Sequence, residues 1–73
     1  MLTTELTRLA AIEAAFAWHN NCYGNGVHNY DDARVAASAV FQSGGYSNED
    51  AHALGRVVAD QLMRDLEERH AES

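Results

Sequence analysis

Apolar side chains recur along the first twenty residues at the spacing of one face of an α-helix. Steps of three and four residues connect the large members of this series, and that repeat is typical of a helix with one buried side. The series consists of Leu2, Leu6, Leu9, Ile12 and Phe16. Thr3 or Thr4 can cap the start of this helix. We therefore predict a helix over about residues 3–21 that buries this series.

Trp18 lies off that series, on the side of the helix that also carries Ala11 and Ala14. This position indicates a second apolar face on the same helix. The indole of Trp18 either packs inside the chain, against small residues of another helix, or contacts a partner. The sequence leaves both alternatives open.

A turn-rich segment follows the first helix. Residues 20–26 read Asn-Asn-Cys-Tyr-Gly-Asn-Gly, and asparagine and glycine tolerate the positive φ angles of turns. We predict a loop as far as Tyr30 and then a short helix over Asp31–Ser43, with Asn29 or Asp31 as its cap. The inward side of this short helix is expected to hold Ala33, Ala36, Ala37, Val40 and Phe41.

Local sequence also predicts where the second helix ends and the third begins. Gly44 is placed for the left-handed residue that ends many helices. Ser47 and Asp50 match the spacing of a capping box, and Tyr46 precedes them as a staple residue. The third helix is predicted to extend from there to about His70.

The third helix carries its large apolar residues in one row beside a groove of small ones. The row is Leu54, Val58, Leu62 and Leu66, and the groove is Ala51, Gly55 and Ala59. A neighbouring helix or a large side chain can lie in such a groove. The pattern as a whole predicts an all-α fold with a single domain over residues 1–73: a compact three-helix bundle of two long helices around a short one.

The composition is that of a folded globular chain. Of its 73 residues 47% are apolar and 22% are charged, with a net charge of −6, which excludes the disordered class. No apolar run approaches the roughly 20 residues of a membrane-spanning helix. The first residues lack the basic and apolar layout of a signal peptide, so we expect a cytoplasmic protein.

Size and codon usage add two expectations about context. A chain this short buries only about 60% of its unfolded surface, so a homodimer would supply buried area that one copy lacks. The five basic side chains are all arginines. Arginine and alanine have GC-rich codons, which favours a high-GC bacterium, or a phage that infects one, as the source.

A polar cluster around the first loop raises the possibility of a metal site. His19 and Cys22 are three residues apart, and His28 follows in the same segment. Zinc binds such nitrogen and sulfur donors as a tetrahedron, with the fourth ligand from His52, Asp31 or Asp32. The spacing matches no zinc-finger pattern, and one cysteine is equally well a small buried apolar residue. A zinc-stabilised fold or metal sensor is the alternative to the main hypothesis.

The acidic charge argues against direct binding of nucleic acid. The second and third helices have the lengths of a helix-turn-helix, but the would-be recognition helix begins with Glu49 and Asp50, which repel phosphates. The reverse idea, an acidic imitation of DNA that inhibits a DNA-binding protein, is a further alternative. Solvated helix faces explain the same charges.

Catalysis is not predicted. Cys22 beside His19 or His28 resembles a nucleophile with a base, but no strained turn or oxyanion site accompanies it. The glycines do not form a phosphate-binding motif. We expect neither an enzyme nor a bound cofactor.

The aromatic residues indicate a protein partner, because tryptophan and tyrosine anchor interfaces. The candidate partner-binding residues are Trp18, Ala11, Ala14, Tyr23, Tyr30 and Tyr46. The resulting hypothesis is a small non-enzymatic helical protein that acts by protein–protein interaction, as a homodimer. A phage or mobile-element modulator of a host protein is the setting that composition favours.

Overall fold

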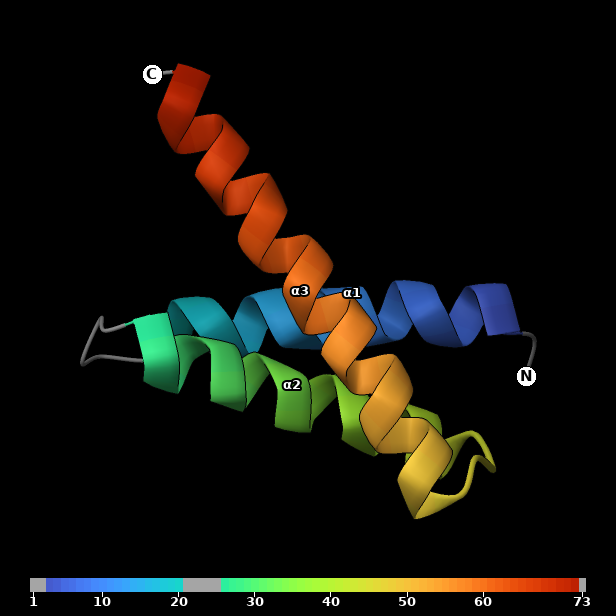
Figure 1. Cartoon of the computed structure of the whole chain (residues 1–73). Coiled ribbons are helices and arrows are strands. Elements are labelled where there is room, and N and C mark those ends of the chain that lie inside the picture. The colour runs from blue at the N-terminus through green and yellow to red at the C-terminus, as the bar shows by residue number, and fades with distance from the viewer. Residues whose placement is uncertain (1–2, 21–25, 73) are drawn as a thin grey trace.

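Three α-helices make up the part of the chain that the structure describes, residues 3–20 and 26–72 of a computed structural model. They are α1 (Thr3–Asn20), α2 (Gly26–Ser43) and α3 (Asn48–Glu72). Helices α1 and α2 lie side by side, and α3 crosses them so that its C-terminal half extends beyond the pair (Figure 1). These residues contain no strand. The predicted all-α three-helix fold is confirmed.

The second helix is longer than the sequence pattern indicated. It begins at Gly26 instead of Asp31, and at 18 residues it is as long as α1. Asn29, expected as a cap, lies inside the helix and is buried. Its side-chain amide donates a hydrogen bond of 3.0 Å to the carbonyl oxygen of Trp18. That carbonyl belongs to the last turn of α1, where carbonyls lack a partner within their own helix, so Asn29 closes α1 and joins it to α2.

The turn between α2 and α3 is a Schellman motif, displaced by one residue from the prediction. Gly45, and not Gly44, has the positive φ, at 102°. The amide of Tyr46 donates to the carbonyl of Phe41, and the amide of Gly45 donates to the carbonyl of Gln42, both at 3.1 Å. The rings of Phe41 and Tyr46 meet edge to face, 5.7 Å between centroids, which is the apolar contact that accompanies this motif.

The predicted cap of the third helix is confirmed. The hydroxyl of Ser47 accepts a hydrogen bond of 3.2 Å from the amide of Asp50. This bond satisfies one of the free amides of the first turn. The carboxylates of Glu49 and Asp50 lie in the same turn, where the positive end of the helix dipole favours them.

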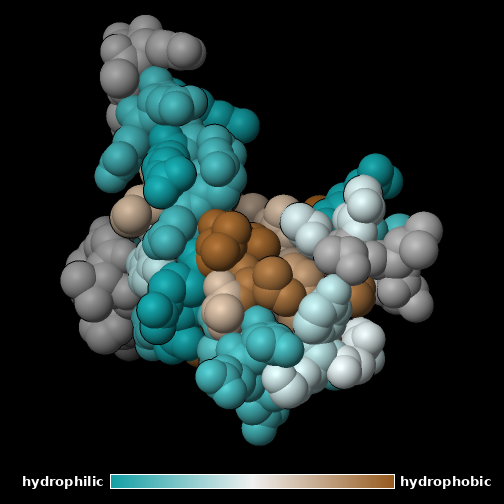
Figure 2. All heavy atoms as spheres, turned by 45° about the vertical axis from the view of Figure 1, so that its right-hand side comes forward, coloured by the Kyte–Doolittle hydropathy of each residue, from teal (hydrophilic) through white to brown (hydrophobic). Residues whose placement is uncertain are grey.

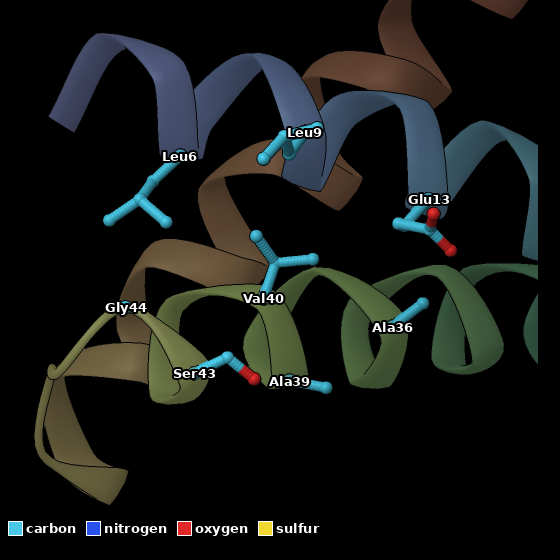
Figure 3. Close-up of a pocket in the computed structure, with 8 residues that line it drawn as sticks. All are labelled: Leu6, Leu9, Glu13, Ala36, Ala39, Val40, Ser43 and Gly44. Carbon is cyan, nitrogen blue, oxygen red and sulfur yellow. The ribbon is translucent and has the colours of Figure 1, made fainter. Parts of the chain in front are cut away.

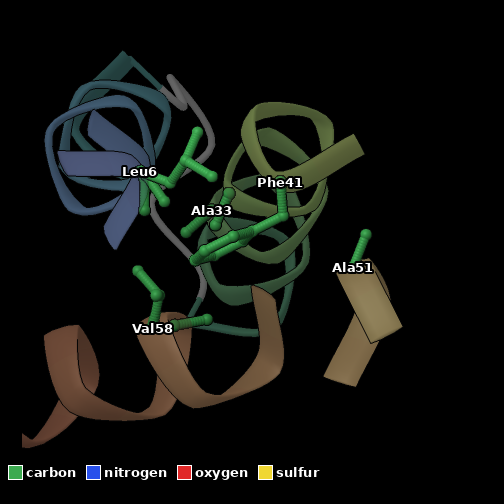
Figure 4. Close-up of a cluster of buried hydrophobic side chains, with 9 residues drawn as sticks. Leu6, Ala33, Phe41, Ala51 and Val58 are labelled. Carbon is green, nitrogen blue, oxygen red and sulfur yellow. The ribbon is translucent and has the colours of Figure 1, made fainter. Parts of the chain in front are cut away.

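Small residues form most of the core. Six of its members are alanines, and only Leu6, Phe41 and Val58 are larger (Figure 4). Among the residues whose burial the structure describes, the core consists of Leu6, Ala10, Ala14, Ala33, Ala37, Phe41, Ala51, Val58 and Ala59. The inward face predicted for α2 is confirmed at Ala33, Ala37 and Phe41. On α3 the predicted small residues Ala51, Gly55 and Ala59 are buried, as is Val58. The other members of the large apolar row, Leu54, Leu62 and Leu66, are half-buried.

The face predicted to be buried on α1 is wrong beyond its first turn. Leu6 is buried, but Leu9, Ile12 and Phe16 are exposed. The buried face instead runs through Ala10 and Ala14, both with no exposed surface. Alanines let α2 and α3 approach the backbone of α1 closely, and large side chains at those positions would hold the helices apart.

Candidate functional site

Large apolar side chains lie open to solvent on the outer side of α1. The exposed fractions are 42% for Leu9, 55% for Ile12 and 67% for Phe16. Apolar side chains also gather near the middle of the face that Figure 2 presents, with hydrophilic surface around them. Single exposed leucines are common on proteins, whereas a group of large apolar residues marks an interaction surface.

These residues belong to one straight line along the helix. Glu5, Leu9, Ile12, Phe16 and His19 follow each other at steps of four, three, four and three residues, the spacing of a coiled-coil seam. At 100° per residue, the centre of this line is about 140° from that of the buried alanine face. Both end members are exposed, one acidic and the other histidine. We call these five residues the outer stripe.

A groove between α1 and α2 adjoins the outer stripe (Figure 3). It has a volume of about 570 Å³. From α1 it is lined by Leu6, Leu9 and Glu13, and from α2 and the following turn by Ala36, Ala39, Val40, Ser43 and Gly44. Leu9 therefore belongs to both the stripe and the groove. The small residues of α2 leave room there for a large apolar side chain.

A smaller hollow lies between α1 and α3. Its volume is about 240 Å³, and its lining includes Ala11, Val57 and Leu62. Val57 is 64% exposed. Ala11, one of the predicted partner-binding residues, is thus on the surface, while Ala14 on the same side of α1 is fully buried in the core. Ala14 is a packing residue.

Trp18 is half-buried and packs against the core of its own chain. The sequence left open whether Trp18 packs inside the chain or contacts a partner. Packing within the chain accounts for the covered part of this side chain. Trp18 lies about 140° around α1 from the centre of the outer stripe, so the two surfaces are separate.

Two of the predicted interface tyrosines are held by contacts within the chain. Tyr30 is half-buried, and its hydroxyl donates a hydrogen bond of 2.7 Å to the carboxylate of Asp60 on α3. That bond, helped by burial and by the negative charge of Asp60, raises the pKa of Tyr30. Tyr46 packs on Phe41. Tyr23 lies outside the described residues.

The structure describes only part of the predicted metal cluster. His19 is exposed at the end of α1, while Cys22 and the side chain of His28 lie outside the described part of the chain. Among the side chains that the structure describes, no three histidine, cysteine or acidic residues come together in a way that could hold a metal. Within the same residues, no helix is long and apolar enough to span a membrane.

The sequence pattern singled out the three large apolar residues of the outer stripe, Leu9, Ile12 and Phe16, but assigned them to the core. A second series on α1, Ala10 and Ala14, is the feature of the sequence that could have identified the buried face. These side chains are small enough for close contact between helices. No family model, curated protein or solved structure matches this chain.

Proposed function

We propose that this chain is a non-enzymatic helical docking protein whose outer stripe binds a partner protein. The observation that carries the proposal is the exposure of Leu9, Ile12 and Phe16 on the side of α1 away from the core. The core lies on the other side of this helix, where α2 and α3 pack on its alanine face.

The exposed area is large enough to matter for binding. The exposed fractions of Leu9, Ile12 and Phe16 together amount to about one and a half whole side chains. Burying that much apolar surface favours association by roughly 2–5 kcal/mol. A partner with an apolar helix face and few charges at its centre suits this surface, because the middle of the stripe carries no charge.

Site-specific photo-cross-linking in cells of the source organism tests the proposal. A photoreactive amino acid replaces Ile12, and a second variant carries it at Ala53, an exposed position of α3 that serves as the control. We expect a discrete cross-linked product from position 12 and none from position 53. Adding Phe16→Asp to the position-12 variant should abolish the product, because a charge enters the apolar surface.

Circular dichroism of the Phe16→Asp variant shows whether the fold survives the change. Phe16 is 67% exposed, so we expect an unchanged helical signal. Equal cross-linking from positions 12 and 53, or no product from position 12, would show that the outer stripe is not a docking surface.

A further inference from the structure

We propose that the occupant of the outer stripe is the same stripe of a second copy of this chain, with the two α1 helices antiparallel about a two-fold axis at Ile12. This inference rests on the proposed function and names its partner. It draws on the polar groups at the ends of the stripe, on the groove beside it and on the surface area of the chain.

The polar groups at the two ends of the stripe are complementary in this arrangement. Glu5 and His19 are each seven residues from Ile12, or about 10 Å along the helix axis. When two antiparallel α1 helices cross at Ile12, Glu5 of one copy lies level with His19 of the other. The carboxylate and the imidazole can then form a hydrogen bond at both ends of the contact. A parallel pairing would place Glu5 opposite Glu5, which repels.

The groove between α1 and α2 lies where a large side chain of the second copy would arrive. In the antiparallel register Phe16 of one copy is level with Arg8 of the other, which lies on the side of the stripe away from the groove. The groove extends along α1 from Leu6 to Glu13, and its lining on the α2 side includes Ala36 and Ala39 (Figure 3). At 100° per residue, Phe16 lies about 20° from the centre of the stripe, on the side of Leu9 and the groove, and two-fold symmetry preserves that side. Each copy therefore offers one aromatic ring and one groove, as an isologous interface requires.

The chain exposes more surface than a compact monomer of its mass. The chain exposes 5083 Å², while a compact monomer of its mass, 8.0 kDa, is expected to expose about 4,450 Å². The excess of roughly 600 Å² approaches the 800 Å² or so that each partner buries in an interface of standard size. The projecting C-terminal half of α3 contributes part of this excess (Figure 1), and the exposed apolar side chains of the outer stripe contribute the part that pairing would cover.

Disulfide trapping tests both the contact and its register. Single cysteines are placed in a full-length Cys22→Ser background, which has no other thiol. Ile12→Cys should give a covalent dimer under mild oxidation, since the two-fold axis brings the Cβ atoms together. Glu5→Cys alone should give none, because its copies lie about 20 Å apart. A mixture of Glu5→Cys and His19→Cys chains should cross-link.

Sedimentation equilibrium of the chain without any substitution accompanies the trapping. We expect a mass of two copies, and Ile12→Glu should raise the dissociation constant roughly a hundred-fold or more. Efficient trapping of Glu5→Cys with itself would overturn the antiparallel register. A native chain that remains a monomer and forms no disulfide at position 12 would overturn self-association. In that case a cellular cross-link from position 12 to a different protein would leave the proposed function standing, and its absence would refute both.

Discussion

Replacing Gly55 with alanine should destabilise this fold, although the same change in most helices is stabilising. Gly55 is buried where α3 crosses α2. A Cβ atom at this position would overlap the hydroxyl of Ser38. It would also lie 2.9 Å from the carbonyl oxygen of Arg34 and from the amide nitrogen of Ser38. Two of these three atoms are backbone, so the clash is relieved only if the helices move apart.

The size of the effect follows from three contributions. Helix propensity favours alanine over glycine by about 1 kcal/mol. Overpacking of a close contact costs about 1–3 kcal/mol. Displacing the Ser38 hydroxyl also disturbs its 2.8 Å hydrogen bond to the Arg34 carbonyl, worth about 1 kcal/mol. The net loss of unfolding free energy is about 1–3 kcal/mol, which lowers the Tm of a domain of this size by roughly 5–20 °C.

Thermal unfolding followed by circular dichroism measures this shift, at one protein concentration because association also stabilises a fold. The matched control is Ala53→Gly, two residues away on the exposed side of α3, which should lose only the propensity difference of about 1 kcal/mol. A Gly55→Ala variant that melts above the native chain would refute the close approach of α2 and α3.

Further predictions concern the cap, the core and the contact between α2 and α3. Ser47→Ala should lower the free energy of unfolding by about 1 kcal/mol in urea titrations, since the amide of Asp50 loses its acceptor; no change would mean that water replaces the hydroxyl fully. Phe41→Leu should cost about 1–2 kcal/mol in the same titrations, as it removes buried volume and the edge-to-face contact, and a neutral result would indicate a loosely packed core. Tyr30→Phe should lower the urea midpoint at neutral pH by removing the bond to Asp60. The pKa of Tyr30 is raised on folding, so this contribution is complete below pH 10 or so and is lost as the pH rises through the raised value. The native and Tyr30→Phe midpoints should therefore converge in strong alkali, and a constant difference would contradict the role of this bond.

Features that depend on neighbouring residues were predictable from the sequence. The cap at Ser47 requires only a hydroxyl three residues before an amide, and the confirmed inward face of α2 follows from helical periodicity. The left-handed glycine was misplaced by one position, because Gly44 and Gly45 both permit the turn. The packing of Gly44 against Leu6 becomes visible only in three dimensions.

The choice of buried face on α1 was not predictable from periodicity. Hydropathy ranks Leu9, Ile12 and Phe16 above alanine, so their line is the expected core side. Two helices pack on α1, however. Both approach α1 where the side chains of α1 are shortest, at Ala10 and Ala14. The distance between helices depends on the packing of the whole bundle. Close packing at the alanine face leaves the face with Leu9, Ile12 and Phe16 exposed to solvent. The candidate docking surface is a consequence of that choice.

Sedimentation equilibrium of the native chain beside Ile12→Glu tests the central claim most directly. If the outer stripe is the contact between two copies, the native protein should have twice the chain mass of 8.0 kDa. The variant should have the mass of a single chain and keep its helical circular dichroism. A native chain with the mass of one copy at every concentration would contradict self-association through α1, as would an Ile12→Glu variant that dimerises as strongly as the native protein.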